Sequence, residues 1–313
     1  MKIRQFGYAC INTELNASNP RVSSSRTIRK ATYEKEGLVR AGDLALQNTK
    51  DLLTILKWNQ NNGIHFFRIS SDILPWKSRW HFRDIETDLR HELFDALKAV
   101  GDFSKMFNHR LTSHPGPFNK LCSNRERVVQ NTIRELEDHN ELFELMDFDA
   151  SHYNKINIHL GAAYDDKVAT AKIWCKNFKR LSPSLQKRIT IENDDRGALY
   201  DTKDLYDMIY QETGVPIVFD FHHHRLHNVH PNMDEQECAE LAISTWPKST
   251  VPVMHWSESR REEMNDNTIT TSAHSDYCYG PLPDFELSRP VDLMIEAKQK
   301  ELALFTLTTA NNE

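Results

Sequence analysis

The chain has 313 residues, of which 39% are hydrophobic and 27% charged, and its formal net charge is −6. This composition is typical of a globular protein with a large core and excludes a disordered chain. No apolar run reaches the roughly 18 residues of a membrane span, so we expect no membrane insertion. The acidic balance argues against nucleic acid as a partner unless bound cations supply positive charge.

Cysteine usage and the first residues bear on the compartment. The five cysteines are scattered, odd in number and never spaced C-x-x-C. This favours reduced thiols over a disulfide framework or a zinc ribbon. The opening MKIRQFGYAC has no charged-then-apolar layout of an export signal. We therefore expect a cytoplasmic protein, and the sequence implies no protein partner.

Eight short apolar segments recur along the chain. In order they are KIRQFGYAC from residue 2, GIHFFRIS from 63, HRLTSH from 109, KINIHLG from 155, RITIEND from 188, IVFDFHHHRLH from 217, VPVMHWS from 251 and VDLMIEA from 291. Continuous apolar runs of this length indicate strands that are covered on both faces, as in parallel sheets.

Helical patterns separate these strands. They span 43–62, 86–100, 125–145, 166–181, 202–213 and 234–244. We expect the first helix to begin after Asp43 as N-cap and to end at Gly63, and we expect Gly214 to stop the helix before the sixth strand. The segment 258–290 contains three prolines and indicates a long loop with little helix.

Alternating strands and helices predict an α/β fold, a closed (β/α)8 TIM-type barrel formed as a single domain by residues 1–313. The runner-up is an open doubly wound sheet. Its dinucleotide-binding version needs a G-x-G-x-x-G turn after a strand, and the sequence contains none.

Ionisable side chains gather where the strands end, which in such a barrel is the rim that carries the active site. Six consecutive strands end in histidine, aspartate or glutamate, and one more histidine lies in the loop before the last strand. These residues are His114, His159, Glu192, Asp220 with His223 just beyond it, His255, His274 and Glu296.

Each of these residues has an ordinary explanation when it is taken alone. A single histidine after a strand is more often solvated or hydrogen-bonded than a metal ligand, Asp220 can cap a helix, and His222 and His224 can be loop residues. Their shared position argues otherwise, because clustered carboxylates repel and buried imidazoles need partners. A cluster of divalent cations would reduce the repulsion between the carboxylates and give the imidazoles partners.

The ligand types narrow the metal and its chemistry. Mixed imidazole and carboxylate ligands suit zinc, manganese or iron and argue against a thiolate site or a calcium cage. Three carboxylates permit bridging, so we expect two or three ions. Two or three ions about 3.5–4 Å apart are typical of enzymes that hydrolyse phosphate esters.

At these residues the sequence resembles the UV damage endonuclease family. The segments FGYACIN, FFRISSDILPW, SHPG, IHLGAAY, ITIENDD, DFHHH, MHWSES and MIEAKQKE recur in this order between residues 6 and 301. The likeness therefore covers nearly the whole chain, and the ordered set is specific although each piece alone is weak.

The resemblance implies a metal-dependent repair nuclease. It would nick damaged double-stranded DNA immediately 5′ to cyclobutane dimers, (6-4) photoproducts and abasic sites and leave a 3′-hydroxyl. The eight rim residues would be the metal ligands, usually of manganese, with Glu192 and Glu296 central to catalysis. Lys298 would lie near the scissile phosphate, and Tyr8 and Asn12 would line the damage pocket.

The sequence departs from the family pattern at three places. Arg79 stands where the family often has a histidine, and Val253 stands where it can have a modified lysine. Both changes affect the outer part of the metal cluster, and Arg79 is either a phosphate contact or a solvated charge. Pro117 and Phe118 replace a frequent glutamine and aromatic residue. We expect Phe118 to act as a wedge in damaged DNA, with packing under its own loop as the alternative.

Other functions use the same kind of barrel. A metal-dependent sugar isomerase or epimerase, an apurinic endonuclease and a catalytically silent barrel with structural metal remain open. The loops after the first two strands favour DNA, because they are basic and rich in aromatic residues. They contain Arg21, Arg26, Arg29, Lys30, Lys35, Lys77, Arg79, Arg83, Trp76, Trp80 and Phe82.

Overall fold

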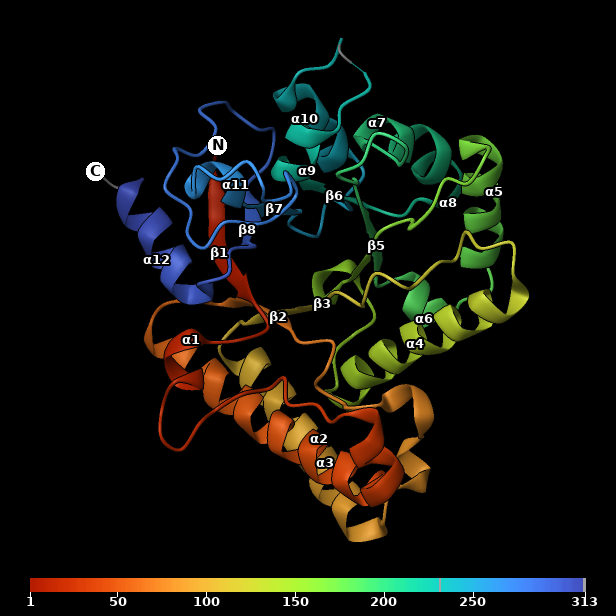
Figure 1. Ribbon diagram of the computed structural model, residues 1–313, viewed down its shortest axis with the longest axis vertical. Helices are drawn as coiled ribbons and strands as arrows, with labels where there is room; N and C mark the ends of the chain where they lie inside the picture. Colours follow the sequence, from red (N-terminus) through yellow and green to blue (C-terminus); the bar gives the residue numbers. More distant parts are fainter. Residues whose placement is uncertain (231, 312–313) are drawn as a thin grey trace.

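Eight parallel strands close into a barrel in the computed structural model, which describes residues 1–230 and 232–311 (Figure 1). Each strand pairs with its neighbours in the sequence, and β8 closes the ring by pairing with β1. The strands are β1 Ile3–Ala9, β2 Phe66–Ile69, β3 Arg110–Ser113, β4 Ile156–Ile158, β5 Ile189–Glu192, β6 Ile217–Asp220, β7 Val253–Trp256 and β8 Val291–Ile295. The predicted barrel is confirmed.

Alternate residues of each strand face the barrel interior, because successive side chains of a strand point to opposite faces. Phe66, Val218, Val253 and Met294 form one buried cluster in the interior. Outward-facing side chains pack against the helices in a second, larger core. Burial on both faces explains why the sequence shows continuous apolar runs rather than alternating ones.

Helices surround the barrel, and α2 and α3 lie side by side (Figure 1). The longer helices are α2 Lys30–Asn61, α3 Thr87–Met106, α4 Glu126–Leu145, α5 Lys167–Phe178, α10 Glu235–Ser244 and α12 Lys300–Ala310. Shorter ones are α1 Thr13–Asn16, α6 Pro183–Gln186, α7 Thr202–Leu205, α8 Gln211–Thr213, α9 Phe221–Leu226 and α11 Arg260–Glu263. Single turns labelled η1 Lys77–Arg79, η2 Phe82–Asp84, η3 His152–Asn154 and η4 Tyr206–Tyr210 complete the set.

One expectation about the helices is wrong. The first helix begins at Lys30 rather than after Asp43, and it is interrupted at Gly37, which has φ +65°. A glycine takes this left-handed conformation without strain, so a helical pattern can change direction there. The sequence pattern also missed α12, whose apolar and threonine-rich stretch does not separate into two faces. Gly214, with φ +70°, does end its helix as expected.

Among residues 1–230 and 232–311, helices with enough length and apolarity to cross a bilayer are absent.

Candidate metal centre at the barrel rim

Strand register brings the predicted ligands to one end of the barrel. Glu192 and Asp220 are the last residues of β5 and β6, and Asp220 lies beside His255 of β7. Glu296 directly follows β8. Glu192, Asp220 and His255 are each at most 1% exposed. The barrel interior therefore holds two carboxylates and an imidazole out of water, which is costly unless something compensates their charge.

Glu192 lies at the centre of four imidazoles. Its carboxylate oxygens lie 3.2 Å from His255 Nδ1, 3.3 Å from His223 Nδ1, 3.4 Å from His114 Nε2 and 4.0 Å from His159 Nε2. The four histidines come from four different strand ends. This convergence is what the shared position of the residues in the sequence predicts.

These contacts shift the pKa values of the cluster. Burial raises the pKa of Glu192, but the surrounding imidazoles outweigh it and hold that pKa well below its usual range. Burial lowers the pKa of His159, whereas Glu192 and Asp194 raise it to about 9. His114 has fewer carboxylates beside it, and burial lowers its pKa to about 4. The cluster thus attracts positive charge to its carboxylates.

Glu296 forms a second part of the cluster. His255 Nδ1 lies 3.1 Å from Glu296 Oε1, and His274 Nε2 lies 4.0 Å from Glu296 Oε2. Arg68, from β2, donates a hydrogen bond to the same carboxylate. Burial opposes ionisation of Glu296, but Arg68 and His255 outweigh it and hold the pKa below its usual range.

The donor set fits divalent cations. The predicted ligands form three groups of three in which the ligand atoms lie within 4.8 Å of one another: His114, His159 and Glu192; Glu192, Asp220 and His223; and Asp220, His255 and Glu296. Consecutive groups share a carboxylate, as bridged ions require. His255 Nε2 and Asp220 Oδ2 are buried and have no hydrogen-bond partner among the described residues. Buried polar atoms are normally paired, so these two atoms fit a site that could hold a cation.

Four further residues orient the predicted ligands, and the sequence analysis missed them in this role. Asp194 Oδ1 lies 3.1 Å from His159 Nδ1, Ser257 Oγ lies 2.7 Å from His274 Nδ1, and the Asn193 carbonyl lies 3.0 Å from His223 Nδ1. Asn157 donates a hydrogen bond to Glu192. Such partners fix the ring orientation and basicity of metal ligands. Strand alternation already signalled Asn157, which precedes His159 by two residues on the same face of β4.

Comparison with known proteins identifies the family. The family model described as UV-endonuclease UvdE matches residues 4–313. The chain belongs to the UV-endonuclease UvdE family. It is 37% identical over 97% of its length to a UV-damage endonuclease of Schizosaccharomyces pombe and 31% identical over 96% to a UV DNA damage endonuclease of Clostridium perfringens. It spans 50% of the first relative and 68% of the second.

A solved structure shows the same architecture. The crystal structure of SacUVDE superposes with a TM-score of 0.80 at 27% identity and covers 97% of this chain and 96% of that one. The predicted family and the predicted fold are both confirmed.

Tyr8 and Asn12 do not line the rim of this UvdE-family barrel, contrary to the expectation from the sequence. Tyr8 is fully buried, and its ring packs against Phe67 on the outer face of the barrel. Its hydroxyl donates to Asn59 Oδ1 at 2.6 Å and accepts from Asn12 Nδ2 at 2.9 Å. Asn12 in turn caps α1 through Leu15 N. Both side chains therefore hold helices against the barrel, because Tyr8 alternates with the inward-facing positions of β1.

The remaining predicted DNA contacts are exposed. Pro117, Phe118, Arg79 and Lys298 are exposed, and Phe118 is 85% exposed. The alternative that Phe118 packs under its own loop is therefore wrong. Val253 offers no ligand atom and lies in the apolar cluster of the interior.

Two of the basic residues assigned to a DNA-facing loop are structural. Lys77 is only 7% exposed, and its ammonium lies 2.7 Å from Asp138 and over the Phe82 ring. Arg26 binds Asp51 at 2.6 Å and donates to the Arg21 carbonyl at 2.8 Å. A sequence pattern shows that basic residues are present, but it does not show whether a basic side chain is paired with a carboxylate.

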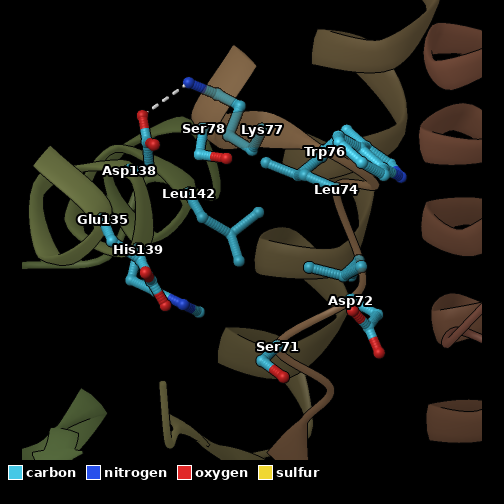
Figure 2. Close-up of a pocket in the computed structure, with 11 residues that line it drawn as sticks. Ser71, Asp72, Leu74, Trp76, Lys77, Ser78, Glu135, Asp138, His139 and Leu142 are labelled. Atoms are coloured by element: carbon cyan, nitrogen blue, oxygen red, sulfur yellow. Dashed lines mark hydrogen bonds and ion pairs between the residues drawn. The ribbon is translucent and has the colours of Figure 1, made fainter. Parts of the chain in front are cut away.

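A cavity of about 190 Å³ lies between the loop after β2 and α4. Figure 2 shows Leu74 and Leu142 among its lining residues and the ion pair between Lys77 and Asp138 at one end. His139 joins it to β3 through a 2.8 Å hydrogen bond between Nδ1 and Ser113 Oγ. Ser113 and His114 are neighbours, so they point to opposite sides of the barrel wall. The cavity is therefore separate from the ligands. Its carboxylates, from Asp72, Glu135 and Asp138, disfavour a phosphate.

Proposed function

We propose that the chain is a metal-dependent endonuclease of DNA repair. It cuts one strand of damaged double-stranded DNA 5′ to cyclobutane dimers, (6-4) photoproducts and abasic sites and leaves a 3′-hydroxyl. The observation that carries this proposal is the chain of three ligand groups joined by Glu192 and Asp220. Family membership favours this nuclease over a sugar isomerase with the same barrel.

The ligands of the cluster are His114, His159, Glu192, Asp220, His223, His255, His274 and Glu296. Two or three ions, manganese in the first place and otherwise zinc or iron, would supply an activated water and neutralise charge on the phosphate. The replacement of the family's histidine and lysine by Arg79 and Val253 leaves fewer outer ligands, which favours two ions over three.

The protein's own groups position these ligands and the DNA. Glu192 and Glu296 hold the ions, and Arg68 fixes Glu296 from one side. Arg68 also brings a permanent positive charge next to the place where the phosphate must lie. Lys298, exposed two residues after the ligand Glu296, is assigned to the scissile phosphate. Together these cations offset the negative charge of the chain at the rim.

Damage recognition is assigned to the loop after β3. Pro117 and Phe118 are exposed beyond the ligand His114, and proteins that kink DNA insert apolar side chains between base steps. A lesion reaches the metals only after it leaves the stack, and unstacking costs least where pairing is already weakened. Phe118 would fill the gap that the lesion leaves.

The direct test uses supercoiled plasmid. UV-irradiated plasmid incubated with the protein and Mn²⁺ should convert to the nicked form, whereas undamaged plasmid and reactions with EDTA should stay supercoiled. End labelling should place the cut on the 5′ side of the lesion. Equal cutting of damaged and undamaged plasmid would contradict the proposal.

The wedge has its own test. Phe118→Ala should cut photoproducts poorly and lose less activity on an abasic site, where there is no base to extrude. Its melting temperature should hardly change, because Phe118 is 85% exposed. Equal losses of activity on both substrates would contradict the wedge role of Phe118 but not the proposed nuclease activity.

A further inference from the structure

Tyr164 is an exposed aromatic residue on the loop that leads from the ligand His159 to α5. Its side chain is 51% exposed. The loop begins at the end of β4 and therefore lies on the same face of the barrel as the metal ligands. None of the roles described above uses Tyr164.

The backbone at Tyr164 is left-handed, with φ +48°. A bulky L-residue rarely adopts this conformation, whereas glycine adopts it without strain. The surrounding loop imposes it. Thr170 Oγ1 donates to the Ala163 carbonyl at 2.7 Å, and the Asp166 side chain caps α5 by accepting from Ala169 N at 2.9 Å. A strained and exposed tyrosine contributes little to folding, so its ring points to function.

The loop of Tyr164 packs against the loop of Phe118. A Cβ atom at Gly161 would lie 3.1 Å from the Lys120 side chain and 3.3 Å from the Asn119 carbonyl. Cys122 Sγ also donates to the Leu160 carbonyl at 3.0 Å. The two loops therefore form one rigid support that presents two exposed aromatic rings, next to the ligands His114 and His159.

Charge decides what the ring of Tyr164 can contact. Asp165 and Asp166 follow it and are exposed. Two carboxylates repel the phosphate backbone, so a backbone contact at this loop is disfavoured. The flat face of a base carries no net charge, and aromatic side chains stack on bases without regard to sequence.

We propose that Tyr164 stacks on a base that leaves the duplex at the lesion, as a second aromatic contact beside Phe118. This inference rests on the proposed function, because it takes damaged DNA as the substrate. It makes Tyr164 a binding residue that stabilises the opened DNA rather than a residue of the metal cluster.

Replacement by glycine separates this role from a structural one. Tyr164→Gly removes the ring and also relieves the left-handed backbone, so its melting temperature should equal or exceed that of the wild type. Binding to a photoproduct duplex should weaken by roughly 5- to 150-fold, the range for loss of one stacked base. Tyr164→Phe should bind like the wild type. The matched control is Asn108→Gly, because Asn108 is also exposed and left-handed but lies before β3 at the opposite end of the barrel.

A fluorescent base tests the contact whether or not the DNA is cut. Duplexes with 2-aminopurine opposite the lesion, or on its 5′ side, are mixed with protein in EDTA. A base that leaves the stack brightens, so the wild type and Asn108→Gly should quench the emission in at least one duplex relative to the complex with Tyr164→Gly. Equal quenching and equal affinity for all variants would overturn the inference, and so would a lower melting temperature of Tyr164→Gly. A wild type that quenches but does not nick irradiated plasmid would refute the proposed nuclease and leave the contact of Tyr164 standing.

Discussion

Both ends of the barrel interior bury charged side chains, but these side chains are paired differently at the two ends. At the end where the strands begin, Asp292 is fully buried and receives Arg4 Nε at 2.7 Å, Arg110 Nη1 at 2.7 Å and Gln5 Nε2 at 3.0 Å. The other Arg110 donors bind the carbonyls of Tyr153, Val251 and His152. Each polar atom named here has a partner among the described residues.

At the rim, the charges are buried but the pairing is incomplete. Among the described residues, His255 Nε2 and Asp220 Oδ2 lack partners, and the imidazoles around Glu192 hold its pKa down although burial raises it. Burial alone therefore does not identify a functional site. A closed network supports the fold, whereas an open one marks the place where a ligand completes it.

The largest expected effect is at the rim. Glu192→Gln removes the carboxylate shared by two ligand groups. Loss of several kcal/mol of charge stabilisation corresponds to about a thousandfold or more in nicking rate. Nicking of irradiated plasmid measures the rate, and bound metal is determined by elemental analysis. Full activity with unchanged metal content would show that Glu192 belongs with the structural charges.

At the other end, Asp292→Asn should act on stability. It leaves Arg110 buried without a counter-ion, which costs about 3–5 kcal/mol. Urea unfolding of the two variants compares the ends directly. We expect a much lower midpoint for Asp292→Asn than for Glu192→Gln, and unchanged Mn²⁺ content in Asp292→Asn. The reverse order of midpoints would contradict the distinction between the two networks.

Added metal should stabilise the protein only through the ligands at the rim. Mn²⁺ at about 100 times its dissociation constant should raise the free energy of unfolding of the wild type by about 2.7 kcal/mol. The same addition should have a smaller effect on Glu192→Gln, while Asp292→Asn should gain as much as the wild type. Melting curves with and without EDTA measure this. An equal gain in all three proteins would mean that the ions bind elsewhere.

Acid should weaken the end where the strands begin. Burial, and Arg110 to a smaller extent, lower the pKa of His152 from 6.5 to about 4. Above pH 6.5 the neutral form dominates in both states and its stabilisation is fully present. Between pH 6.5 and 4 the unfolded chain binds protons that the folded one does not, so stability falls. His152→Gln should reduce the slope of unfolding free energy against pH in this window by up to one proton, measured by urea titrations. An unchanged slope would show that His152 titrates normally.

The smallest effect concerns two neighbouring cations. Arg79 is exposed, and Arg79→Ala should lower the slope of log affinity against log salt by about 0.9, the value for one phosphate contact. Lys77 is buried against Asp138, so Lys77→Ala should leave that slope unchanged and lower stability instead. Binding to damaged duplex at several salt concentrations separates them. Identical slopes for wild type and Arg79→Ala would make Arg79 a solvated charge.

The sequence by itself determined the barrel and brought the candidate ligands to one rim. Eight apolar runs alternating with helical patterns specify parallel strands, and the ends of those strands must meet on one face whatever the loops do. His114, His159, Glu192, Asp220 and His255 could therefore be grouped before any distance was known. The ordered motifs also identified the family, because they contain the residues at the strand ends.

Only the tertiary structure decided which side of its strand each remaining residue faces and which partner it contacts. Tyr8 lies near the carboxyl end of β1, as rim candidates do on other strands, yet alternation turns it outward to Asn59. Lys77 and Arg26 look like free basic residues until Asp138 and Asp51 approach from distant segments. The exposure of Tyr164 likewise depends on a loop conformation fixed by packing. Local pattern sets periodicity and composition, but long-range contacts set orientation, pairing and exposure.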